Sequence, residues 1–251
     1  MSKIIAICNQ KGGIAKTTTA TCLAAGLREK GYKTLLVDMD PQTNATDTYR
    51  AKTEETGTLY DLMIQGDTED IIQHTDLGDI IAGDQLLKDA DKQINGPSAN
   101  FRLKKGLKTI TDGYDYVILD TPPTLGILLI NALTAADSCI IPLTADRYSL
   151  QGLTTLKKNI DDVREYTNPD IKVDGLLLVK FSGRMNTEKA VLNALEDYAE
   201  SMETKIYDTK IRNTNTVQKA QLSRQGLFAY DPNCTAAVDY KEFVKEVEKD
   251  G

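Results

Sequence analysis

The feature that most constrains the fold is a regular alternation of short apolar runs with longer segments of helical periodicity. The apolar runs lack an apolar–polar alternation, which is typical of strands buried on both faces of a parallel sheet. Strands are predicted at residues 4–8, 34–37, 117–119, 139–141 and 176–179, and helices at 17–30, 149–166 and 188–203. Strands that alternate with helices pair in parallel through right-handed crossovers. The sequence therefore predicts one α/β layered domain over residues 1–251, with a mostly parallel sheet flanked by helices on both faces.

A glycine-containing loop joins the first predicted strand to the first predicted helix and reads Gln10-Lys-Gly-Gly-Ile-Ala-Lys-Thr-Thr18. Glycines let the backbone turn tightly and aim successive N–H groups at a phosphate, and the helix N-terminus adds a positive dipole end. Lys16 is placed to reach the β- and γ-phosphates, and the Thr17 hydroxyl to ligate Mg²⁺. The loop departs from the pattern G-x-x-x-x-G-K-[ST], because Gln10 and Ala15 stand where glycine is expected.

A second lysine, Lys11, stands on the same loop, five residues before Lys16. Two ammonium groups on one short loop repel each other. Either a polyanion lies between them, or one of them points away to a phosphate held by a second subunit.

Carboxylates follow two of the predicted strands. Asp38 and Asp40 come after the strand at 34–37, and Asp120 comes after the strand at 117–119. In an open parallel sheet, ligands bind beyond the carboxyl ends of the strands, so these side chains are expected on the same edge as the glycine-containing loop. Carboxylates at this edge suit the surroundings of a phosphate-bound Mg²⁺.

Composition excludes several classes of protein. No apolar run reaches the ~18 residues of a membrane-spanning helix, and the N-terminus lacks the pattern of a signal peptide. The four cysteines are scattered, and with His74 as the single histidine, expected to be exposed, no zinc site is predicted. These features favour a reducing, cytoplasmic location. The net charge of −7 excludes a protein coated in positive charge but leaves room for local basic patches at 102–108 and 205–224.

In combination, the motifs resemble the ParA/Soj family of deviant Walker-A ATPases, over about residues 2–247. The segments that carry the resemblance are 11–18, Asp38-Met-Asp-Pro-Gln42, Asp120-Thr-Pro-Pro123, Asn131-Ala-Leu133, Pro142-Leu-Thr-Ala-Asp146, Gly152-Leu153 and Tyr230-Asp-Pro232. The resemblance implies a P-loop fold, ATP and Mg²⁺ as cofactors, and a homodimer with ATP sandwiched between the subunits. It also implies non-specific DNA binding, nucleoid association, and a ParB-type centromere-binding partner that stimulates hydrolysis.

The resemblance also implies roles for single residues. Lys16 resembles the phosphate lysine, Thr17 the Mg²⁺ ligand, and Lys11 the lysine that reaches the nucleotide across the dimer. Asp40 resembles the switch aspartate that orients the attacking water beside the metal, and Asp120 the residue that holds Mg²⁺ through water. The remaining nucleotide-binding positions implied are Gly12, Gly13, Ile14, Ala15, Thr18, Arg212 and Asn213, the first two at the dimer face and the last two beside the adenine.

Two departures from the family pattern bear on function. Ala15 replaces glycine, and a Cβ there either costs little or forbids a positive φ, depending on the local backbone. Among the DNA-contact arginines, Arg184 matches one, while the other falls near Asn215 or Thr216, which do not neutralise a phosphate. Basic residues of the same region are candidate substitutes: Lys210, Lys219 and Arg224.

Other function classes stay open. A MinD-like positioning ATPase would act on a membrane surface or a protein cargo through a basic amphipathic C-terminal helix. Here an apolar stripe of Val238, Phe243, Val244 and Val247 faces mixed charges, so we expect it to pack on the domain.

Two classes are set aside. A relative of the nitrogenase iron protein would need two cluster cysteines near the dimer axis, and only Cys139 lies near a suitable loop; a bacterial tyrosine kinase would need a tyrosine-rich tail, and Tyr240 is the only tyrosine in the last twenty residues. A binding module without turnover remains if Ala15 disables hydrolysis. The position of the phosphate loop predicts no N-terminal extension for operator binding.

Overall fold

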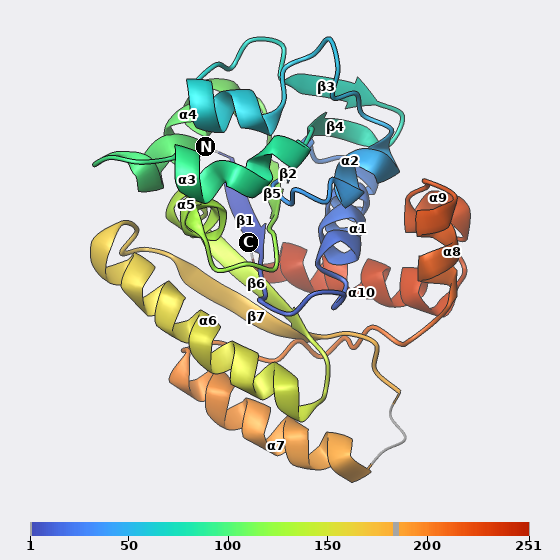
Figure 1. Cartoon of the computed structure of the whole chain (residues 1–251). Coiled ribbons are helices and arrows are strands. Elements are labelled where there is room, and N and C mark those ends of the chain that lie inside the picture. The colour runs from blue at the N-terminus through green and yellow to red at the C-terminus, as the bar shows by residue number, and fades with distance from the viewer. Residues whose placement is uncertain (1, 183–185, 251) are drawn as a thin grey trace.

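A twisted sheet forms the centre of the computed structural model, which describes residues 2–182 and 186–250 (Figure 1). The described residues form seven strands in the spatial order β3-β4-β2-β5-β1-β6-β7. Their bounds are β1 Lys3–Ile7, β2 Thr34–Asp38, β3 Ile72–Thr75, β4 Gly78–Ile81, β5 Tyr116–Asp120, β6 Ser138–Leu143 and β7 Lys172–Leu178. Only the pair β3–β4 is antiparallel among these neighbours, so the predicted, mostly parallel sheet is confirmed.

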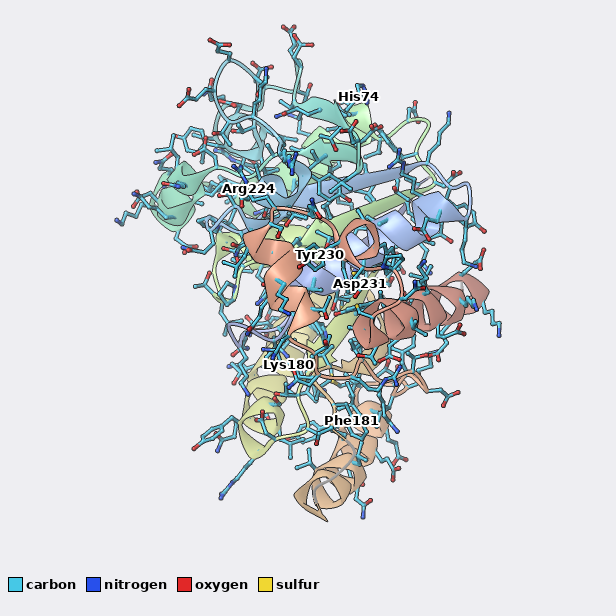
Figure 2. All side chains as sticks on the ribbon, turned by 90° about the vertical axis from the view of Figure 1, so that its right-hand side faces the viewer. His74, Lys180, Phe181, Arg224, Tyr230 and Asp231 are labelled. Carbon is cyan, nitrogen blue, oxygen red and sulfur yellow. The ribbon has the colours of Figure 1, made fainter. Side chains whose placement is uncertain are left out.

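Helices cover both faces of the sheet (Figure 1). Their bounds are α1 Lys16–Glu29, α2 Asn44–Tyr49, α3 Ala90–Gln93, α4 Arg102–Ile110, α5 Ile127–Ala135, α6 Arg147–Tyr166, α7 Asn186–Ser201, α8 Thr216–Leu222, α9 Leu227–Tyr230 and α10 Thr235–Asp250. Short helical turns lie at η1 Asp61–Gln65, η2 Gln85–Asp89 and η3 Ala99–Phe101. Arg224 and Tyr230 mark the segment that carries α8 and α9, on the side of the molecule shown in Figure 2. No described helix is long and apolar enough to cross a membrane.

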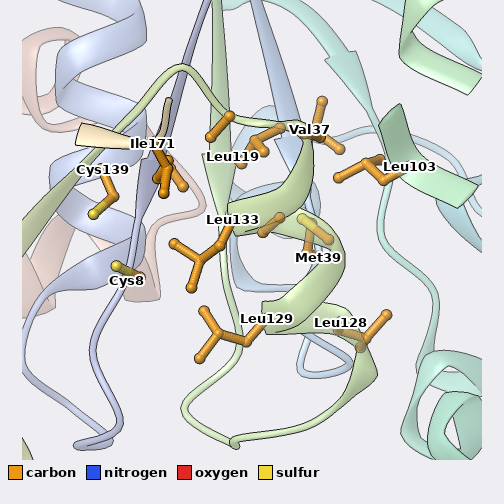
Figure 3. Packing of buried hydrophobic residues seen from close by; sticks show 14 of the residues in the cluster. Cys8, Val37, Met39, Leu103, Leu119, Leu128, Leu129, Leu133, Cys139 and Ile171 are labelled. Carbon is orange, nitrogen blue, oxygen red and sulfur yellow. The ribbon is translucent and has the colours of Figure 1, made fainter. Parts of the chain in front are cut away.

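Two apolar cores lie on opposite faces of the sheet. Successive side chains of a strand point to opposite faces, so Ile5 and Ile7 of β1 join one core and Ala6 joins the other. The first core is closed by α1 and α10, the second by α4, α5, α6 and α7. Figure 3 shows the second core, where Cys8 and Cys139 lie as free thiols among leucines. This two-sided burial explains why the strands read as unbroken apolar runs.

The C-terminal helix α10 packs directly on α1. A Cβ on Gly26 would lie 2.6 Å from a methyl group of Val244, so glycine is what lets the two helices approach this closely. Phe243, Val244 and Val247 are buried, as the sequence predicted. Val238 is 43% exposed and does not belong to the packed stripe, because it lies on the solvent side of the first turn of α10.

The β3–β4 hairpin is not predicted by the sequence. Its outer strand is polar, short and at the edge of the sheet, so it has no apolar run to signal it. His74 lies there, exposed, with its Nδ1 2.7 Å from a carboxylate oxygen of Asp79. The five predicted strands and the three predicted helices lie within a few residues of the observed β1, β2, β5, β6, β7, α1, α6 and α7, whereas the sequence predicts no bounds for the other helices.

Candidate functional site

A cavity of about 710 Å³ lies beyond the carboxyl ends of the central strands. Among its lining residues are nine that the sequence singles out: Gly12, Gly13, Ala15, Lys16, Thr17, Thr18, Asp40, Arg212 and Asn213. The fold thus brings together residues that lie about 200 positions apart in the chain. The volume is in the range of cavities that hold small ligands and cofactors.

The loop between β1 and α1 presents a row of backbone donors to this cavity. Gly13 and Ala15 both adopt left-handed backbone conformations, with φ of +68° and +65°. No oxygen of the described residues accepts a hydrogen bond from the N–H groups of residues 12–18. Alternating left-handed geometry and the first turn of α1 gather such N–H groups into an anion-binding concavity. The side chain of Ile14 is buried and does not line the cavity, so this residue offers its N–H alone.

Lys16 begins α1 and is buried against the loop. Its Nζ lies 3.3 Å from the carbonyl oxygen of Lys11, and the residue as a whole is 7% exposed. Burial lowers the pKa of Lys16, although the nearby carboxylates of Asp120 and Asp40 raise it. A polyphosphate would restore the favourable surroundings that burial removes from this ammonium group.

Asp120 ends β5 behind Thr17 and is fully buried. Neither of its carboxylate oxygens has a hydrogen-bond partner among the described residues. Burial and the facing carboxylate of Asp38 raise the pKa of Asp120, while the nearby Thr17 hydroxyl and Lys16 lower it. A buried carboxylate without a partner is costly unless a cation or a donor reaches it, so the position fits a hydrated divalent cation.

Asp38 anchors the segment that carries Asp40. Its Oδ2 accepts hydrogen bonds from the N–H and the hydroxyl of Thr46, at 2.8 and 2.7 Å. Burial raises the pKa of Asp38 to about 6, although the bonds from Thr46 oppose that shift. Asp40 lies at the cavity wall, where its Oδ1 accepts a hydrogen bond from the N–H of Gln42 at 2.9 Å, while its Oδ2 accepts none from the described residues.

Lys11 does not point into this cavity. Its Nζ lies 2.7 Å from Oδ2 of Asp146, just before α6, and 3.2 Å from the hydroxyl of Thr144. Partial burial raises the pKa of Asp146, but the hydrogen bonds from Lys11, Thr144 and the N–H of Ser149 outweigh it and lower the pKa to about 2. The Lys11 side chain is 38% exposed and points away from Lys16, so the two ammonium groups do not share the cavity.

Arg212 and Asn213 line the far side of the cavity. The guanidinium of Arg212 is held by Asp239 of α10, with Nη2 2.6 Å from Oδ1 and Nε 2.9 Å from Oδ2. Asp239 also accepts the backbone N–H of Arg212 at 2.9 Å. This pairing ties Arg212 to α10, and the N–H of Ile211 binds the carbonyl oxygen of Leu178 at the end of β7, so Arg212 is held in place on both sides.

Comparisons with known proteins agree with this geometry. A family model described as "AAA domain" matches residues 2–173. The sporulation initiation inhibitor protein Soj of Bacillus subtilis is 37% identical over 256 aligned residues that cover all of both chains. The chain belongs to the ParA/Soj family.

A further member of the ParA/Soj family, the chromosome partitioning protein ParA of Myxococcus xanthus, is 40% identical over 203 residues, 79% of this chain and 72% of that one. Among solved structures, the fold is similar to that of cobyrinic acid a,c-diamide synthase from Mycobacterium smegmatis with bound ADP and magnesium. The TM-score is 0.84 at 28% identity, over 99% of this chain and 95% of the other.

The candidate DNA contacts of this ParA/Soj chain lie apart from the phosphate loop. Lys219 is exposed on α8, and Arg224 follows α8 with its Nη2 2.5 Å from Oδ1 of Asp47. Lys210 lies over the ring of Phe181, 5.4 Å from the ring centroid. Arg184 lies outside the described residues.

Sequence reasoning missed several residues of the site. Lys180 lines the cavity and donates a hydrogen bond to the carbonyl oxygen of Gly13 at 2.6 Å. It directly follows the predicted strand at 176–179, so the rule that selected Asp38 and Asp120 would also have selected it. Thr46 and Asp239 carry no such signal, because they act through hydrogen bonds between elements far apart in the sequence.

Proposed function

We propose that this chain is a Mg²⁺-dependent ATPase that partitions DNA: its ATP-bound dimer binds DNA non-specifically, and partner-stimulated hydrolysis releases it. The observation that carries the proposal is the row of free N–H groups at residues 12–18, which surrounds Lys16 in a cavity of about 710 Å³. Donors in this arrangement bind phosphate oxygens. The structurally similar cobyrinic acid a,c-diamide synthase was solved with ADP and magnesium, which supports an adenine nucleotide as the ligand.

The buried carboxylate of Asp120 supports Mg²⁺ as the second cofactor. Thr17 would supply its hydroxyl to the metal, and Asp120 would hold a metal-bound water, which gives the orphaned oxygens a partner. When bound, the metal neutralises charge that develops on the phosphate oxygens.

Asp40 supports hydrolysis. Its Oδ1 is fixed by the N–H of Gln42, which leaves Oδ2 to accept a hydrogen bond from the attacking water and orient it. Asp40 and Lys16 flank the same cavity, so the nucleophile and the phosphate charge would be handled by adjacent groups. One oriented carboxylate without further electrostatic support predicts slow turnover until a partner completes the site.

The position of Lys11 supports a dimer with sandwiched ATP. Its ammonium lies outside the cavity of its own subunit, while Gly12 and Gly13 are exposed beside it. A second subunit that approaches these glycines would bring a nucleotide within reach of Lys11 in exchange for Asp146. The dimer would double the sparse basic residues near α8, which is what a chain with a net charge of −7 needs to bind DNA.

The MinD-like alternative is disfavoured by α10. Its apolar residues Phe243, Val244 and Val247 are buried against the domain, so they are not available to a membrane surface. We therefore propose a cytoplasmic, nucleoid-associated protein with a ParB-type activator. The acidic stretch at residues 52–91 is a candidate dock for a basic segment of that activator.

The test is co-sedimentation with non-specific duplex DNA at low and moderate salt, with ATP-Mg²⁺, ADP-Mg²⁺ or no nucleotide. We expect the protein to bind DNA only when ATP-Mg²⁺ is present. DNA binding should fall steeply as the salt concentration rises and should be lost in Lys16→Ala. Lys172→Ala, which removes an exposed lysine at the opposite end of β7, is the matched control and should bind like the wild type. An ATP-dependent dimer that binds no DNA in any state would refute DNA as the cargo and direct the search to lipid vesicles and protein cargo.

A further inference from the structure

Lys180 is a third lysine at the phosphate loop, and it comes from a distant part of the chain. It lies just beyond β7, at the position labelled in Figure 2, and lines the cavity. Its backbone is left-handed, with φ of +53°, a conformation that costs a non-glycine residue about 1–2 kcal/mol. Its Nζ lies 2.6 Å from the carbonyl oxygen of Gly13, and no carboxylate of the described residues pairs with it. Strained backbone of this kind is commonly retained at functional sites.

The hydrogen bond fixes the orientation of one peptide group in the loop. In a trans peptide, the carbonyl of Gly13 and the N–H of Ile14 point in opposite directions. An ammonium group that holds the Gly13 carbonyl on one side therefore holds the Ile14 N–H on the other. That N–H is one of the donors for which the described residues provide no acceptor.

Without this restraint the peptide group would be held less firmly, because the backbone of glycine is freer than that of any other residue. Gly13 has no Cβ, and the space where one would stand holds no other atom within 4 Å. A rotated peptide would replace an N–H donor with a carbonyl oxygen at the phosphate position, and that oxygen would repel a phosphate.

We propose that Lys180 is a positioning residue for the nucleotide phosphates: it locks the Gly13–Ile14 peptide so that the Ile14 N–H faces the phosphate site. The inference rests on the proposed nucleotide-binding function and adds a residue to it. Lys180 acts through Gly13, in contrast to Lys16, which would contact the phosphates directly.

The test compares nucleotide-free stability with affinity for phosphate-bearing ligands. The variants are Lys180→Met, which keeps the length of the side chain, Lys180→Gly, which also relieves the backbone strain, and Lys180→Arg, which restores a charged donor. Lys172→Met is the control at the other end of β7. The readouts are the Kd of fluorescently labelled ADP with Mg²⁺, its displacement by pyrophosphate, and the urea-unfolding midpoint without ligand.

We expect Lys180→Met and Lys180→Gly to weaken ADP and pyrophosphate binding about tenfold. This is the lower end of the range of effects seen when a charge-assisted hydrogen bond is lost. Lys180→Arg should return to within about threefold of the wild type. The unfolding midpoint of Lys180→Gly should not fall, since glycine accepts the left-handed backbone. If Lys180 had a purely structural role, its loss would lower the urea-unfolding midpoint, and Lys180→Arg would not restore ADP affinity.

Two results would overturn the inference: wild-type affinity in both Lys180→Met and Lys180→Gly, or no recovery in Lys180→Arg. Either result would leave the proposed function intact as long as the wild type binds ADP and Lys16→Ala does not. Failure of the wild type itself to bind ADP would refute the proposed function and the inference with it.

Discussion

Replacing Ala15 with glycine should make the nucleotide-free protein more stable. Ala15 precedes α1 with φ of +65° and ψ of +29°, in the left-handed region. Alanine would cost little here only with a negative φ, so at this position it is strained. Left-handed backbone costs alanine about 1–2 kcal/mol. Glycine avoids that cost but gives up about 0.5–1 kcal/mol through the greater freedom of its unfolded chain. The difference predicts a gain of about 0.5–1 kcal/mol for Ala15→Gly.

Equilibrium urea unfolding without nucleotide measures this difference. A gain of that size corresponds to about 1–4 °C in Tm for a chain of this length. The matched control is Gly13→Ala, at φ of +68°, where an added Cβ meets no atom within 4 Å, so strain alone acts. It should lose about 1 kcal/mol. Ala25→Gly, inside α1, should also lose about 1 kcal/mol because its backbone is helical.

The three variants separate strain from a general effect of glycine. Stabilisation by Ala15→Gly together with destabilisation by Ala25→Gly is the pattern that local backbone geometry predicts. If Ala15→Gly lowered the unfolding free energy as Ala25→Gly does, the left-handed assignment of Ala15 would be refuted.

Three further outcomes follow from the geometry. Burial and the carboxylate of Asp38 raise the pKa of Asp120 in the folded protein. The protonated carboxyl therefore contributes its full stability below about pH 4, and the free energy of unfolding falls as the pH rises through the raised pKa. In Asp120→Asn the free energy of unfolding by urea should depend less on pH and should be about 1–3 kcal/mol higher at pH 8. The variant should also lose Mg²⁺-dependent ADP binding. Unchanged stability at pH 8 would contradict this reasoning. Asp146→Asn keeps an acceptor for the Ser149 N–H but weakens the hold on Lys11, so ATP-dependent dimerisation in light scattering should rise a few-fold rather than fall. Gly26→Ala places a methyl group against Val244 and should lower the free energy of unfolding by about 1–3 kcal/mol. The double variant with Val244→Ala should lose less than the sum of the two single losses, and additive losses would argue against this contact.

The sequence predicts the central fold well because burial on both faces leaves a direct trace. The strands β1, β2, β5, β6 and β7 appear as apolar runs, and the residues that follow them mark the edge where the cavity lies. The β3–β4 hairpin leaves no such trace, since its outer strand is polar and half-exposed. Short helices such as α2 and α9 are likewise set by tertiary packing rather than by periodicity.

The site is predictable where it depends on consecutive residues and less so elsewhere. Gly12, Gly13 and residues 15–18 line one cavity because they are neighbours in one loop, so spacing alone locates them. The sequence left open where Lys11 points, and the carboxylate of Asp146, 135 residues further along the chain, decides it. The anchoring of Asp38 by Thr46 and of Arg212 by Asp239 depends on distances between elements that spacing does not encode.

Of the eight described non-glycine residues with left-handed backbone, four lie in or beside the cavity. Ala15 and Lys180 line the cavity, Thr43 lies between two lining residues, and Arg224 pairs with Asp47 of the wall. Each such conformation costs about 1–2 kcal/mol and persists only where hydrogen bonds hold it, as Lys180 holds Gly13 and as the N–H of Thr43 binds the carbonyl of Asp40 at 2.9 Å. The loop donors and Asp40 are therefore ordered before any ligand arrives, and a phosphate that binds there does not have to supply the free energy of ordering them. The strained backbone lowers the stability of the protein without ligand, while the ordered loop raises its affinity for the ligand. Glycine at Lys180 should lower the affinity, because it also removes the ammonium group that holds the loop. Glycine at Ala15 should raise the stability, because it relieves strain alone.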